Sequence, residues 1–61
     1  MDKIDLALEV IEMDKFYDED EDFRRYVDAG RKSYGWNMVE AFENSITREY
    51  YRYIKNMRAG K

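Results

Sequence analysis

WNMVEAFENSITREYYRYIKNMR, residues 36–58, is the stretch that decides the predicted fold of this chain. Its apolar residues recur at intervals of three and four positions, the spacing of one helical face, and neither Pro nor Gly interrupts them. We therefore predict one helix over about residues 37–58, roughly 30 Å long at about 1.5 Å per residue, against which the other elements pack. Its predicted inner face carries Val39, Phe42, Ile46, Tyr50, Tyr53, Ile54 and Met57.

Two shorter helices are predicted before this stretch. The first covers about residues 3–14, and its expected inner face is formed by Ile4, Ala7, Leu8 and Ile11, with Val10 widening it. Leu6 and Met13 lie outside that face, so we expect them to contact a third element or a second subunit. Residues 14–17 interrupt the pattern. A second helix follows over about residues 19–32, opened by a capping box of Asp18 and Glu21.

The connection between the second and third helices carries clear stop and start signals. Gly35 provides a residue that can take the left-handed conformation at the end of a helix, and Asn37 with Glu40 forms a capping box for the next one. Trp36 at this elbow is the expected anchor for all three helices. The predicted fold is thus all-α, a single domain over residues 1–61 with two shorter helices packed on a long C-terminal helix.

Charge is distributed unevenly along the chain. Of the 14 acidic and 11 basic residues, eleven acids and four bases lie in residues 1–28, whereas three acids and seven bases lie in residues 29–61. The total of −3 therefore hides an acidic first half and a basic second half. A hydrophobic fraction of 44% at regular spacing indicates a folded chain despite the high charge.

The composition excludes most kinds of catalytic site. The chain has no cysteine and no histidine, so disulfides, thiolate nucleophiles and the usual zinc ligands are missing. We find no catalytic, metal or cofactor motif, and we expect a non-enzymatic protein without cofactors. No apolar run approaches the ~20 residues that span a bilayer, so we expect a cytoplasmic protein without membrane contacts, in the bacterial host if a phage encodes it.

Five consecutive acids at residues 18–22 form the most conspicuous local feature. Their spacing resembles the start of a calcium loop, but the positions that need Gly and Glu hold Phe23 and Ala29, so calcium is not the favoured ligand. Acids also suit the positive end of a helix dipole. Because five adjacent like charges exceed what capping needs, we favour a surface that meets a basic partner, formed by Asp5, Glu9, Glu12, Asp18, Glu19, Asp20, Glu21 and Asp22.

A second candidate surface lies on the long helix opposite its apolar face. There, an outward Tyr51 lies among Arg48, Arg52, Lys55 and Arg58. An aromatic ring among cations is typical both of a stacking platform for an unpaired base and of a protein contact. The negative total charge makes nucleic acid the less favoured of the two partners.

These patterns favour a small interaction protein as the function. In this hypothesis the acidic residues replace phosphates and block a basic, nucleic-acid-binding surface of a partner protein, as an inhibitor carried by a phage or another mobile element. The alternative is a structural or adaptor homo-oligomer, such as a homodimer, in which the long helix pairs with its copy. Its interface would use Leu6, Met13, Met38 and Tyr51. Single-stranded nucleic-acid binding through the basic and aromatic surface is the third hypothesis.

Overall fold

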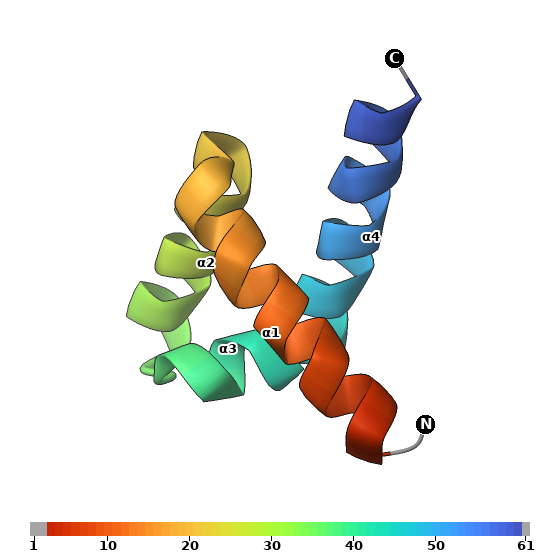
Figure 1. The fold of residues 1–61 in the computed structure, drawn as a ribbon. Coiled ribbons are helices and arrows are strands. Elements are labelled where there is room, and N and C mark those ends of the chain that lie inside the picture. Colours follow the sequence, from red (N-terminus) through yellow and green to blue (C-terminus); the bar gives the residue numbers. More distant parts are fainter. Residues whose placement is uncertain (1–2, 61) are drawn as a thin grey trace.

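The computed structural model describes residues 3–60, which form four helices joined by short connections (Figure 1). The helices are α1 (Lys3–Glu19), α2 (Glu21–Tyr34), α3 (Met38–Glu43) and α4 (Ser45–Ala59). No strand occurs among the described residues, so the predicted all-α class is confirmed. In Figure 1 the short α3 runs along the base of the molecule between α2 and α4, and α1 crosses it diagonally.

The predicted long helix is interrupted at Asn44. This residue has an extended backbone (φ −66°, ψ 134°), and its Oδ1 accepts a hydrogen bond from the Ile46 N–H at 3.0 Å. An Asn side chain competes with the helix for nearby backbone donors, so a helix can end at Asn without Pro or Gly. The prediction of one helix over residues 37–58, and of three helices in all, is therefore wrong. The capping box of Asn37 and Glu40 that opens α3 is confirmed.

Because of this break, α4 buries a different face from the predicted one. Its buried side chains are Thr47, Tyr51 and Ile54. The side chains expected inside but found exposed are Val39 of α3 and Ile46, Tyr53 and Met57 of α4. The prediction assumed an unbroken helix, in which the inner face of α3 continues into α4 at about 100° per residue. The extended residue 44 interrupts that rotation, so other side chains of α4 face inward. Phe42 and Ile54 are in the core as predicted, and Tyr50 packs against it.

Helix α1 is longer than predicted and also buries a different face. It continues through residues 14–17 to Glu19. Its inward side chains are Val10, Met13, Phe16 and Tyr17, and of these Val10 belongs to the predicted inner face. The predicted inner residues Ile4, Ala7, Leu8 and Ile11 are exposed. Both sides of α1 are apolar. A helix that continues past residue 14 brings two large aromatic rings to the same side as Met13, where they pack against the core.

The junction between α1 and α2 is made by Asp20. Its Oδ1 accepts a hydrogen bond from the Phe23 N–H at 3.0 Å, so Asp20 caps α2. The predicted cap, Asp18, lies inside α1 instead. At the other end of α2, Gly35 is left-handed (φ 71°), as predicted, and it donates its N–H to the Arg31 carbonyl.

Phe23 holds the central position that the sequence predicts for Trp36. Its fully buried ring lies 5.3–6.4 Å, between centroids, from four other rings, which belong to Phe16, Phe42, Tyr50 and Tyr51. Aromatic pairs at such separations add to the stability that burial gives. Trp36 is half-buried at the edge of the core and stacks on Tyr34 at 4.7 Å.

Candidate functional site

Basic side chains of α4 face acidic side chains of α1 and of the α1–α2 junction. The two groups that the sequence separates thus pair within the molecule. We call this set of contacts the ion-pair seam. Its members are Glu9, Glu12, Asp20, Asp22, Arg48, Arg52, Lys55 and Arg58.

Glu9 and Arg52 form a bidentate ion pair in the seam. The Nε and Nη2 atoms of Arg52 donate to the two carboxylate oxygens of Glu9, at 3.0 and 3.1 Å. Such two-pronged contacts fix orientation as well as charge. The guanidinium of Arg48 also lies 3.9 Å from Glu9.

Arg58 ties the end of α4 to the start of α2. It donates from Nε to Asp20 at 3.0 Å and from Nη2 to Asp22 at 2.8 Å. Burial raises the pKa of the Asp20 carboxyl, but hydrogen bonds from Arg58 and from the Phe23 N–H outweigh burial, so the pKa lies below its usual value. Asp20 is therefore held ionised by its cap and its ion pair together.

Tyr51 connects the seam to the core. Its side chain is only 4% exposed, and its hydroxyl donates to the Glu12 carboxylate at 3.0 Å, which Lys55 also contacts at 3.2 Å. These two hydrogen bonds hold the pKa of Glu12 below its usual value. The prediction of an outward Tyr51 is wrong, because the break at Asn44 sets a different inner face for α4.

Four carboxylates of α1 remain outside the seam. Asp5, Asp14, Asp18 and Glu19 are exposed, and none of them forms an ion pair within residues 3–60. Glu21 pairs with Arg25 at 2.8 Å, but both side chains are largely in solvent, where such a pair contributes little. The outer side of α1 therefore carries four carboxylates that form no ion pair within the described residues.

The same helix exposes an apolar stripe. Ile4, Leu8 and Ile11 are 67%, 54% and 66% exposed, and they recur at intervals of four and three residues. A groove of about 570 Å³ runs beside them between α1 and α3, lined by Lys3, Leu6, Ala7, Val10, Ile11, Val39 and Glu43. We call Ile4, Leu8 and Ile11 the α1 stripe. Large contiguous apolar patches on a protein surface are common sites of contact with partners.

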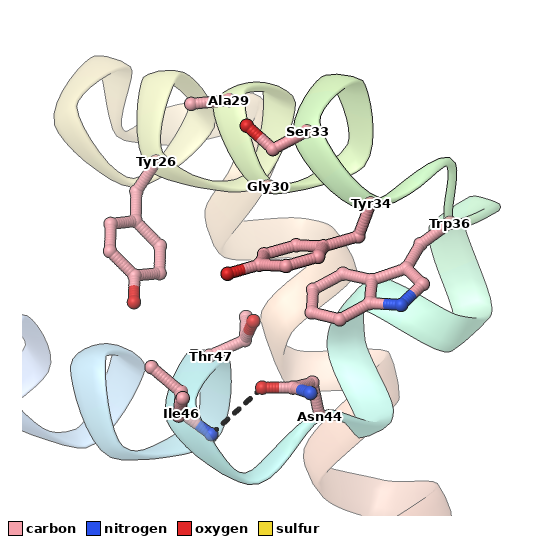
Figure 2. Close-up of a pocket in the computed structure, with 9 residues that line it drawn as sticks. All are labelled: Tyr26, Ala29, Gly30, Ser33, Tyr34, Trp36, Asn44, Ile46 and Thr47. Atoms are coloured by element: carbon pink, nitrogen blue, oxygen red, sulfur yellow. Dashed lines mark hydrogen bonds between the residues drawn. The ribbon is translucent and has the colours of Figure 1, made fainter.

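A third surface is an aromatic cleft of about 450 Å³ between α2 and the start of α4. Figure 2 shows the hydroxyl groups of Tyr26 and Tyr34 pointing into the space between these helices, with Trp36 beside Tyr34. Tyr26 stacks on Tyr50 at 4.2 Å between ring centroids, which supports one side of the cleft. All nine lining residues are uncharged: Tyr26, Ala29, Gly30, Ser33, Tyr34, Trp36, Asn44, Ile46 and Thr47.

No known protein family, curated protein or solved structure matches this chain. The chemistry of its own surfaces is therefore the basis for a functional proposal. Within residues 3–60, no group of three or more acidic residues is placed to hold a metal ion, and none of the helices is long and apolar enough to cross a membrane.

The structure divides the predicted acidic residues into two groups. Glu9, Glu12, Asp20 and Asp22 belong to the seam, whereas Asp5, Asp18 and Glu19 face solvent and Glu21 pairs only with Arg25. All four predicted cations lie in the seam. The sequence analysis missed Asp14, the exposure of the α1 stripe and the aromatic cleft. Two apolar faces on one helix were the available signal for the stripe, since a small domain can bury only one of them.

Proposed function

We propose that this chain is a small acidic protein-binding module that occupies a basic surface of a partner protein. One observation carries the proposal: the cations of α4 are engaged by seam carboxylates, while Asp5, Asp14, Asp18 and Glu19 stay free on the outer side of α1. The charge left for a partner is therefore negative, and the partner that it attracts is positive.

In this mechanism the free carboxylates take the place of phosphates. Lys and Arg side chains that bind a nucleic-acid backbone donate equally well to carboxylates, and such charge-assisted hydrogen bonds are stronger than neutral ones. Long-range attraction steers the two proteins together, and the helix then blocks the surface. An inhibitor of a nucleic-acid-binding protein, of the kind that a phage or mobile element carries, fits this chemistry.

The other two hypotheses have less support. Stacking of an unpaired base needs an accessible ring, but Tyr51 is buried, and Arg52, Lys55 and Arg58 already bind carboxylates. A homo-oligomer built on Leu6, Met13, Met38 and Tyr51 lacks its surface, because Met13 and Tyr51 are in the core. Self-association would have to use other residues.

Capture of the partner from the native host tests the proposal. The tagged protein is compared with an Asp14→Asn/Asp18→Asn/Glu19→Gln variant, which removes free charge and leaves the seam intact. Asp20 is not substituted, because it caps α2 and binds Arg58. A matched control, Glu49→Gln/Asn56→Lys/Ala59→Lys, makes the same change of net charge at exposed positions of α4.

We expect the wild-type protein and the control to retain the same partner, and the α1 variant to lose it. Increasing salt should weaken the wild-type interaction steeply, because salt screens exposed charges. Equal retention by all three proteins, with the same salt dependence, would show that the free carboxylates of α1 are not the binding surface.

A further inference from the structure

We propose that the α1 stripe docks a basic amphipathic helix of the partner protein, an inference that rests on the proposed function and names its contact. At about 100° per residue, Ile4, Leu8 and Ile11 lie within about 60° of one another on the outer side of α1. They form one continuous apolar ridge over two turns. Apolar anchors at spacings of three and four are how a helix binds another helix.

Acidic side chains border this ridge on both sides, and the exposed Lys15 continues it by one turn at its C-terminal end. By the same helical geometry, Asp5 and Glu12 border the α1 stripe on one side, and Asp14 and Asp18 border it on the other. Glu12 is shared with Lys55, and the other three form no ion pair within the described part of the chain. The complementary surface is an apolar strip with Lys or Arg on both flanks, which is the pattern of a basic amphipathic helix.

The same charges disfavour a second copy of this chain. Helix α1 holds six acids and two bases over Lys3–Glu19, so two α1 helices placed face to face would bring two acidic borders together. Like charges juxtaposed at an interface oppose association. A partner of opposite charge removes that repulsion and adds attraction.

The groove between α1 and α3 provides a place for an anchoring side chain. Its apolar wall continues from Ile11 to Val39, which is 55% exposed on α3. A Leu or Phe from the partner helix, entering there, would cover apolar surface on two elements at once. Burial of such an anchor is what concentrates binding energy at the centre of an interface.

Titration with designed peptides tests this inference. The probe is a helical peptide of about 14 residues with Leu at intervals of three and four and Lys elsewhere. A second peptide carries Glu in place of Lys. Binding is followed through amide NMR shifts of the full chain. We expect the Leu/Lys peptide alone to bind, with shifts on α1 and α3 near Leu8, Ile11 and Val39.

Substitutions in the stripe supply the matched comparison. We expect Leu8→Ser/Ile11→Ser to weaken the Leu/Lys peptide by about tenfold or more, because two buried aliphatic contacts are lost. Ile46→Ser/Tyr53→Ser, which alters two equally exposed side chains of α4, should leave the affinity unchanged.

Three results would overturn the inference: equal binding of the Leu/Glu peptide, shifts confined to the aromatic cleft, or a wild-type dimer in sedimentation that Leu8→Ser/Ile11→Ser dissociates. The dimer would mean that a second copy covers the stripe.

Binding of the two variants to the host partner distinguishes this inference from the proposed function. If the stripe variant keeps that partner while the charge-neutralised variant loses it, the acidic module stands and helix docking on α1 is wrong. If both variants keep the partner, the proposed function itself fails.

Discussion

At the residue scale, Tyr51 links the hydrophobic core to the charged surface. Its ring lies 5.5 Å from Phe16 and 5.7 Å from Phe23, between centroids, and its hydroxyl reaches Glu12 at the rim. A buried tyrosine hydroxyl needs a partner, and here the partner is a carboxylate that Lys55 also binds. One side chain therefore fixes both the packing of α4 and the position of a seam carboxylate.

Tyr51→Phe should raise the pKa of Glu12 toward its ordinary value of 4.5, because the hydrogen bond from the hydroxyl is the main cause of the lowered pKa. Carboxyl chemical shifts measured against pH report this directly. Tyr53→Phe is the control, since Tyr53 is exposed on the same helix. An unchanged pKa in Tyr51→Phe would mean that the hydroxyl does not bind Glu12 in solution.

The sign of the pH dependence follows from the same shift. Folding lowers the pKa of Glu12, so the unfolded chain binds more protons, and stability decreases as the pH falls below about 4.5. The wild-type protein should lose more of its free energy of unfolding in this range than Tyr51→Phe does. Urea unfolding at several pH values gives the comparison.

At the element scale, the break at Asn44 decides which faces of α3 and α4 are buried. The Asn44 N–H bonds to the Ala41 carbonyl at the end of α3, and its side chain caps the first turn of α4. The chain thus ends one helix and starts the next with a single residue. Removal of the Asn44 side chain therefore tests whether its cap stabilises the break between α3 and α4.

Asn44→Ala should lower the free energy of unfolding by about 1 kcal/mol, the usual cost of losing an N-cap, whereas Asn44→Asp, which keeps an acceptor, should stay near the wild type. Chemical denaturation measures both. A stabilised Asn44→Ala protein would contradict this account, because it would indicate that α3 and α4 prefer to join into one helix.

Local signals in the sequence were sufficient at the connection between α2 and α3, but they failed at the start of α2, where Asp20 and not Asp18 is the cap. Between α2 and α3, Gly35 and the pair Asn37 and Glu40 were placed correctly. Apolar spacing was insufficient where two faces of a helix are apolar, as in α1, since burial then depends on the other elements. A cap such as Asn44 inside a periodic stretch is also invisible to spacing.

At the scale of the whole molecule, the acidic half of the chain folds over the basic half. Of the candidate site, the sequence identified the residue types and their charge, but it could not show that Glu9 would meet Arg52, because 43 positions separate them. The pairing of α4 cations with carboxylates of α1 and α2 therefore depends on the tertiary fold and cannot be predicted from local sequence. Because these residues pair with one another, we propose that they hold α4 against α1 and α2.

Arg58→Met should lower the free energy of unfolding more than Arg25→Met. Loss of Arg58 leaves Asp20, whose side chain is 11% exposed, without its cation, and an unpaired charge in that position is costly. Arg25 pairs with Glu21 in solvent, so its loss should stay within about 0.5 kcal/mol of the wild type. Thermal melts at low salt compare the two variants, and equal melting temperatures would exclude a stabilising role for the seam.

In the mechanism we propose, free carboxylates on the outer side of α1 replace phosphates on a partner. Competition measures this most directly: the partner captured from the host is bound to a labelled nucleic acid, and this protein is then added. We predict that the wild-type protein displaces the nucleic acid and that the Asp14→Asn/Asp18→Asn/Glu19→Gln variant does not. A partner that keeps its nucleic acid when saturated with the wild-type protein would contradict the claim.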